Sequence, residues 1–314
     1  SKMSDWFFQM VFCATTMSII SGTVAERIKL LPFFIFAIVL TGFIYPIQAS
    51  WVWGGGFLSE MGFSDFAGST LVHSVGGWAA LTGAIIIGPR LGKYASNGSV
   101  IAIPGSNLPL ATIGTFILWF GWFGFNAGSA LAADGNAGMA MVVTHISAAT
   151  ASLVWMLMDW SRFGKPTLIG LVTGTIAGLA SITPASGSVG PIGALIIGAS
   201  AGIICYLFVN IVKNNLKIDD SLDVFAVHGV GGLLGIILVA FLVDANIGGA
   251  GYADGINAIS QLMIQLKGTV AVLVLSVVAT IVITYVVKLT VGLRVDDSSE
   301  VEGLDISSHG ETNG

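Results

Sequence analysis

Long apolar stretches separated by short polar connections recur along the whole chain. A transmembrane helix needs about 20 mostly apolar residues, and nine stretches approach or reach that length. They predict helices at residues 6–25, 31–52, 67–88, 108–130, 138–158, 167–184, 191–212, 222–243 and 268–292. The pattern therefore predicts an all-α, polytopic membrane helix bundle over residues 1–293, followed by a polar tail at residues 294–314.

Composition supports a membrane protein and excludes several other classes. Hydrophobic residues make up 54% of the chain and charged residues 9%, whereas a soluble domain carries about 25% charge. The net charge of −5 is small and concentrated in the tail, which argues against nucleic-acid binding. Cys13 and Cys205 lie in apolar spans without metal-ligand spacing, so we interpret them as small core residues. We expect no metal and no cofactor.

The distribution of basic residues predicts the orientation. Cytoplasmic connections of membrane proteins are enriched in Lys and Arg. Of the 12 such residues, only Lys2 and Lys267 fall on one side of the predicted bundle. The other side holds Arg27, Lys29, Arg90, Lys93, Arg162, Lys165, Lys213, Lys217, Lys288 and Arg294. We therefore expect a cell-membrane protein with the N-terminus of this chain outside and its C-terminus in the cytoplasm.

Two similar hexapeptides suggest an inverted repeat. Val72-His73-Ser74-Val75-Gly76-Gly77 resembles Val227-His228-Gly229-Val230-Gly231-Gly232, and each histidine follows an aspartate, Asp65 or Asp223. The predicted orientation makes these two spans run in opposite directions. Sites of inverted-repeat transporters lie near the bilayer midplane, and an intramembrane histidine is costly unless it faces a cavity or a partner. A chance match of short motifs is the alternative.

Longer motifs resemble the ammonium transporter (Amt/MEP/Rh) family. They are residues 65–73, DFAGSTLVH, residues 122–129, WFGFNAGS, residues 223–229, DVFAVHG, and the tail residues 303–305 and 309–311. Trp53 places the resemblance in the Amt branch. Family members have eleven spans, so the resemblance implies that the nine seen here correspond to the third onward. An odd number of helices starting outside also predicts an N-terminally truncated chain.

The resemblance implies roles for individual residues. It implies an outer ammonium recruitment site, a gate beneath it, a structural anchor, and twin histidines that line an apolar pore. The corresponding residues are Phe12, Trp53 and Ser129 with Trp122 nearby, then Phe8 and Phe125 for the gate, Asp65 for the anchor, and His73 with His228. Each has an ordinary alternative: interfacial aromatic belt for the tryptophan, packing for the phenylalanines, and a helix cap for the aspartate.

The physics of such a pore favours deprotonation of ammonium at the outer side and passage of neutral ammonia, because a bare cation pays several kcal/mol in an apolar channel. The sequence does not decide whether the proton follows. The main alternative function is an ammonium sensor that binds without conducting. No protease-like or other enzymatic motif is visible in the spans, so we do not expect an enzyme. The resemblance further implies a homotrimer in the lipid bilayer and a cytoplasmic PII signal protein as partner of the tail.

Overall fold

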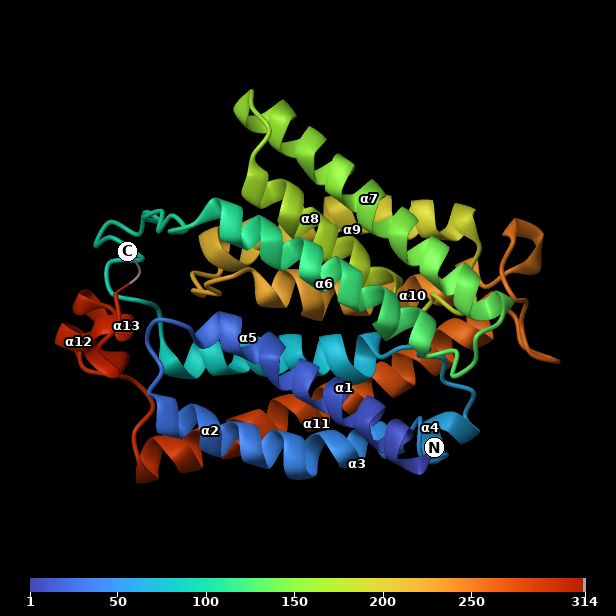
Figure 1. Cartoon of the computed structure of the whole chain (residues 1–314), viewed down its shortest axis with the longest axis horizontal. Coiled ribbons are helices and arrows are strands. Elements are labelled where there is room, and N and C mark those ends of the chain that lie inside the picture. Colours follow the sequence, from blue (N-terminus) through green and yellow to red (C-terminus); the bar gives the residue numbers. More distant parts are fainter. Residues whose placement is uncertain (313–314) are drawn as a thin grey trace.

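The computed structural model describes residues 1–312 and is built of helices in two groups (Figure 1). One group contains α1 (Lys2–Val24), α2 (Leu30–Val39), α3 (Tyr45–Ser50), α5 (Val75–Ile87) and α11 (Ala258–Thr290). The other contains α6 (Leu108–Gly128), α7 (Gly135–Phe163), α8 (Leu168–Ile182), α9 (Pro191–Asn210) and α10 (Gly231–Leu242). Two short helices, α4 (Phe57–Glu60) and η5 (Ala245–Ile247), lie in connections between the longer ones.

Several long helices contain a π-helical stretch. These are η1 (Leu40–Ile44) between α2 and α3, η2 (Ser69–Ser74) before α5, η3 (Ile211–Asn215) after α9, and η4 (Phe225–Val230) before α10. A π-helical stretch inserts an extra residue into the turn and often marks a functional site. The two histidines of the repeated hexapeptides lie on η2 and η4.

Within residues 1–312, eight helices are long and apolar enough to cross a membrane. The predicted span at residues 167–184 is the exception, because α8 has only 15 residues, which is about 22 Å of helix against a hydrocarbon core of about 30 Å. The chain continues through a non-helical turn in which Thr183, Ala185 and Ser186 are fully buried. Irregular backbone at membrane depth is tolerated where protein surrounds it.

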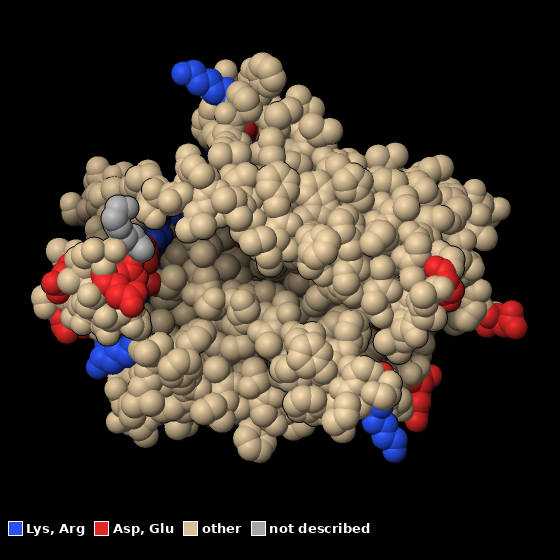
Figure 2. Space-filling view, viewed as in Figure 1, with Lys and Arg blue, Asp and Glu red and all other residues tan. Residues whose placement is uncertain are grey.

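The two histidine-bearing spans form the centre of the bundle. In the span at residues 69–87, 78% of the most apolar window is buried, and in the span at residues 225–242 the share is 67%. In the other spanning helices it is 11–44%. On the face shown in Figure 2, acidic and basic side chains lie toward the ends of the molecule and its middle is almost free of charge. Both observations fit a bundle whose flank faces lipid and whose centre is protein-lined.

The C-terminal tail is folded against the bundle as α12 (Asp297–Glu302) and α13 (Leu304–His309), at the end opposite the N-terminus in Figure 1. Arg294 forms an ion pair with Glu300 at 2.7 Å and donates to the carbonyl of Pro89 at 2.7 Å. Glu300 also accepts the N–H of Leu91 at 2.7 Å, and an antiparallel bridge joins Ile28 to Arg294. The tail is therefore attached to the connections that follow α1 and α5.

Candidate functional site

The centre of the candidate site is a pair of stacked imidazoles. Nδ1 of His73 lies 3.1 Å from Nδ1 of His228, and the rings lie 5.2 Å apart at an interplanar angle of 22°. His73 is 1% exposed, while His228 is partly buried. A hydrogen bond between two Nδ1 atoms requires one to carry a proton and the other to be bare. When each ring carries a single proton, the pair is neutral and its two rings are complementary tautomers.

A close crossing of backbones brings the two histidines together. η4 packs against α5 while α10 packs against η2, so the two histidine-bearing spans run antiparallel, as the inverted repeat predicts. A Cβ on Gly77 would lie 2.3 Å from the backbone nitrogen of Gly229 and 2.5 Å from its Cα. Such distances leave no space for a side chain. Glycine in the repeated hexapeptide therefore permits the approach that sets the imidazole spacing.

Asp65 holds the start of the first π-helix. Its Oδ1 accepts the N–H groups of Gly68 and Ser69 at 2.9 and 2.7 Å. Its Oδ2 accepts those of Thr70 and Leu71 at 2.8 and 3.1 Å. The first N–H groups of a helix have no partner within the helix. This buried carboxylate accepts four such N–H groups at the start of η2. The anchoring geometry and the alternative cap are therefore one and the same arrangement.

The corresponding aspartate of the second half is Asp220, which the sequence comparison missed. Asp220 precedes His228 by eight residues, as Asp65 precedes His73. Its Oδ2 accepts the N–H of Phe225 at 2.7 Å. Asp223, the aspartate noted from the sequence, instead pairs with Lys213 at 2.6 Å. The equal spacing of eight residues from aspartate to histidine was the sequence signal that identifies Asp220 as the counterpart of Asp65.

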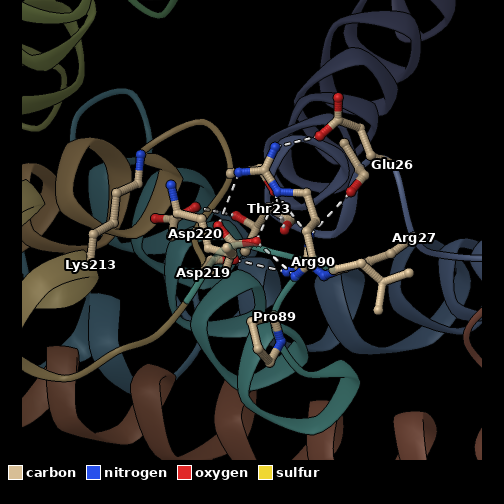
Figure 3. Close-up of polar contacts among 12 residues, drawn as sticks. Thr23, Glu26, Arg27, Pro89, Arg90, Lys213, Asp219 and Asp220 are labelled. Carbon is tan, nitrogen blue, oxygen red and sulfur yellow. Dashed lines mark hydrogen bonds and ion pairs between the residues drawn. The ribbon is translucent and has the colours of Figure 1, made fainter. Parts of the chain in front are cut away.

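Charged groups surround Asp220 where the chain leaves the bundle (Figure 3). Burial, followed by the negative charge of Asp223, raises the pKa of Asp220 to about 6. Burial alone would also raise the pKa of Asp219, but hydrogen bonds from Arg90 and the charges of Arg90 and Arg27 lower it below its usual value. The two adjacent carboxyl groups thus have opposite shifts because only Asp219 contacts a guanidinium directly.

Trp122 lies beside His73. The two rings stack at 5.0 Å with an angle of 14°, and the indole Nε1 donates to Thr183 Oγ1 at 2.8 Å. The hydroxyl of the buried turn after α8 therefore fixes the indole, which covers one face of the imidazole. Trp122 also meets the ring of Phe125, with centroids 5.8 Å apart.

An aromatic cluster of Phe8, Phe12, Trp53 and Phe125 borders the site. Phe12 stacks on Phe125 with centroids 4.1 Å apart and meets the edge of Trp53 at 5.6 Å. Phe8 contacts Phe12 at 4.7 Å. Phe12 therefore belongs to the layer predicted for the gate as well as to the predicted recruitment group.

Two further hydrogen bonds involve Trp53 and Ser129. Trp53 Nε1 donates to the carbonyl of Asp65 at 3.3 Å, so the indole is tied to the segment that starts η2. Ser129, one helical turn after Phe125 at the end of α6, donates its hydroxyl proton to the Phe125 carbonyl at 2.8 Å. The serine oxygen consequently retains its lone pairs as an acceptor.

Two cavities meet at the histidine level. One, of about 480 Å³, is lined by the phenylalanines, Trp122 and His73. The other, of about 390 Å³, is lined by both histidines together with Trp122 and the hydroxyls of Thr15, Ser18 and Ser21 on α1. His73 and Trp122 line both cavities, together with Thr15 and Leu118. The aromatic-lined cavity therefore adjoins a more polar one at His73, and the polar one also reaches His228.

These features define a class of protein: a multi-pass helical membrane protein in which two similar, antiparallel spans bring a pair of histidines together at the centre of the bundle. The model of the Ammonium Transporter Family matches residues 1–314, and the chain belongs to this family. Members of the family are transporters or channels rather than enzymes.

Named relatives cover most of the chain. An ammonium transporter of Aquifex aeolicus is 46% identical over 308 residues, which is 98% of this chain and 70% of that protein. Ammonium transporter Amt1 of Archaeoglobus fulgidus is 43% identical and covers 97% of this chain and 76% of its own length. The chain thus spans about three quarters or less of these relatives.

Solved structures share the fold. A sensor Amt protein superimposes with a TM-score of 0.92 at 38% identity, covering 97% of this chain and 76% of that one. Mep2 of Saccharomyces cerevisiae gives 0.81 at 33% identity, with coverages of 91% and 65%. The predicted helical membrane fold and the predicted family are confirmed.

Proposed function

We propose that this chain transports ammonium by recruiting the cation at an outer aromatic site, removing one proton and passing ammonia through the apolar centre. The observation that carries the proposal is the imidazole pair joined at 3.1 Å, at the point where an aromatic-lined cavity adjoins a more polar one. The outer end is the one with the N-terminus, and the folded tail lies in the cytoplasm. Ten of the 12 basic residues on the tail side support this orientation.

Trp53, Phe12 and Ser129 supply the recruitment chemistry. An aromatic face attracts a cation through its quadrupole, with a stabilisation of about 2 kcal/mol once water is excluded. The Ser129 oxygen accepts an N–H hydrogen bond, because its own proton is donated to Phe125. A spherical alkali ion has no N–H group to donate. Asp65 stabilises this site indirectly, since the same segment holds Trp53 and η2.

The phenylalanine layer favours loss of the proton. Phe12 and Phe125 are in direct contact at 4.1 Å, with Phe8 adjacent. A cation entering this layer would lose its hydration shell without gaining polar partners, which costs several kcal/mol. Ammonia is neutral and pays much less. The gate therefore passes the deprotonated species when the ring pair opens.

His73 and His228 provide a polar path below the gate. Their shared hydrogen bond leaves one bare ring nitrogen and one N–H available to an ammonia molecule. Nε2 of His73 is buried and has no partner among the described residues. A proton moves along the pair when the bare Nε2 of one ring takes up a proton, the shared proton passes from Nδ1 to Nδ1, and the other ring releases the proton on its Nε2. Both rings then stay neutral and have exchanged tautomers. Trp122 keeps the His73 ring in its orientation.

Replacement of both histidines tests the proposal. In proteoliposomes, His73→Ala combined with His228→Ala should abolish selective ammonia flux or produce a leaky cation conductance. His145→Ala is a matched control, because this histidine is exposed on α7 and stacks on Trp119. Unchanged, ammonium-selective flux in the double variant would refute the pore role. Tight ammonium binding without flux in the parent protein would favour the sensing alternative.

The proposed assembly is a homotrimer that a cytoplasmic PII protein engages at the tail side. The ordered attachment of α12 through Arg294 and Glu300 supports a folded docking face rather than a free acidic segment. Native mass spectrometry of the detergent-solubilised protein, with and without PII, measures both states. A monomer that ignores PII would contradict this part.

A further inference from the structure

Residues 219–221, which precede the His228 π-helix, are bound by the end of α1 and by the connections that follow α1 and α5 (Figure 3). Asp220 is 1% exposed and divides its two oxygens between different elements. Oδ1 accepts the hydroxyl of Thr23, in the last turn of α1, at 2.9 Å. Oδ2 accepts the N–H of Phe225, the first residue of η4, at 2.7 Å. One buried carboxylate thus joins the start of η4 to the end of α1.

The neighbours of Asp220 connect this segment to the end of α5. Arg90 donates from Nε to Asp219 Oδ2 at 2.8 Å and from a terminal nitrogen to Oδ1 at 3.0 Å. Arg27, whose side chain is fully buried, donates to the Asp219 carbonyl at 2.8 Å, to Ser221 Oγ at 2.9 Å and to the Gly88 carbonyl at 2.8 Å. The ends of both histidine-bearing helices are therefore fixed to one another.

These hydrogen bonds of Asp219, Asp220, Arg27 and Arg90 affect the geometry of the imidazole pair. His73 belongs to the η2–α5 helix and His228 to the η4–α10 helix, so their separation depends on how these helices are placed along each other. The Gly77–Gly229 crossing fixes the lateral distance. The axial position of η4 is fixed where its first N–H groups are bound, because a π-helix offers no internal partner for them. Asp220 is the side chain that binds there.

We propose that Asp220 is a positioning residue for His228, acting as the counterpart of Asp65 in the second half of the inverted repeat. The proposal rests on the function proposed above for the histidine pair. Asp65 holds η2 through four N–H groups of its own segment. Asp220 holds η4 through one N–H and takes its second bond from α1. Loss of the carboxylate therefore frees both the start of η4 and its link to Thr23.

The test compares Asp220→Ala, Thr23→Val and His228→Ala, singly and with Asp220→Ala placed on the His228→Ala background. Ammonium flux into proteoliposomes is measured at saturating and limiting concentrations, with the amount of folded protein matched by monodisperse elution and thermal unfolding. Asp223→Asn is the matched control, since it removes the same charge three residues away from a partly exposed pair with Lys213. Such pairs contribute little.

We expect Asp220→Ala to lower the maximal flux by about ten- to a hundredfold, as misplacement of a reacting group by up to 1 Å does. The half-saturating concentration should stay near that of the parent, because the outer site is untouched. Thr23→Val should give a smaller loss of the same kind. Asp220→Ala should add little on the His228→Ala background, and Asp220→Asn, which keeps one acceptor oxygen, should recover part of the flux.

Other outcomes distinguish a failure of the positioning role of Asp220 from a failure of the function proposed for the histidine pair. If His228→Ala lowers selective flux while folded Asp220→Ala does not, Asp220 has no positioning role. Fully additive losses in the double variant would likewise show that Asp220 acts independently of the imidazole. If His228→Ala itself leaves selective flux unchanged, the function proposed for the pair fails first.

Discussion

Replacement of Gly77 by alanine tests the geometry on which the imidazole pair depends. The added Cβ would lie 2.3 Å from the backbone nitrogen of Gly229, whereas ordinary contact begins at 3.4 Å. The obstacle is backbone, which cannot rotate away as a flexible side chain can. η4 and α5 must therefore separate by about 1 Å in a tightly packed interior.

That separation is enough to break the shared hydrogen bond. The two Nδ1 atoms are 3.1 Å apart, and a further displacement of about 1 Å takes them beyond the range of a hydrogen bond. A misplacement of this size at a reacting centre lowers rates by roughly a hundredfold. The overpacking also costs about 1–3 kcal/mol of stability, so the variant should fold but unfold at a lower temperature.

The assay is ammonium-driven flux in proteoliposomes, monitored with a trapped pH indicator, at equal amounts of folded protein. Gly83→Ala is the control in the same helix, because its Cβ would meet Val24 at an ordinary 3.6 Å. Alanine there should keep the flux and stabilise the helix slightly. A well-folded Gly77→Ala protein with the flux and selectivity of the parent would refute the claim that imidazole contact sets conduction.

Three further predictions concern the periphery of the site. Trp53→Leu should raise the half-saturating ammonium concentration roughly five- to thirtyfold, which corresponds to a lost cation–π interaction of about 1–2 kcal/mol. Trp6→Leu, at a residue that is 64% exposed, is the control and should leave this concentration unchanged. Equal half-saturating concentrations in the two variants would contradict a recruitment site at Trp53. Burial holds the pKa of Asp220 at about 6, above about 3.9 in an unfolded chain, so the folded state gains most from this group below pH 4. Its contribution to the free energy of unfolding falls by about 3 kcal/mol as pH rises through 6. Asp220→Asn does not titrate, so its melting temperature should rise relative to that of the parent between pH 4 and 6. Melting temperatures that change with pH in the same way for both proteins would contradict the raised pKa. Arg294→Ala removes the ion pair that holds Glu300, so cleavage after this glutamate by a Glu-specific protease should accelerate severalfold; an unchanged rate would mean that the tail is held by other contacts.

The overall fold could be predicted because hydropathy and basic-residue counts report directly on membrane helices. The one weak element was residues 167–184, where apolar composition continues through a turn that is buried in protein and so looks like helix. A hydropathy pattern measures surroundings rather than backbone hydrogen bonding. For the same reason it could not predict the π-helical stretches that carry the histidines.

The sequence also contained signals for the positions of two residues near the histidines. Trp122 precedes Ser129 by seven residues, about 10 Å along a helix, which already separates it from the level of the serine. Asp220 shares the eight-residue spacing of Asp65 to its histidine, although Asp223 looks closer to the repeated motif. Contacts that join distant segments, such as Trp122 to Thr183 or Asp220 to Thr23, have no counterpart in local spacing.

The two halves of the repeat match in backbone course but not in how their anchors are bound. Asp65 is satisfied within its own segment. Asp220 accepts one of its hydrogen bonds from Thr23 at the end of α1. Phe12, near the middle of α1 and eleven residues before Thr23, stacks in the aromatic layer. Weakening Asp220 should therefore displace this layer much less than it displaces His228. Weakening the segment around Asp65 should reach the layer directly, because the carbonyl of Asp65 accepts the indole N–H of Trp53.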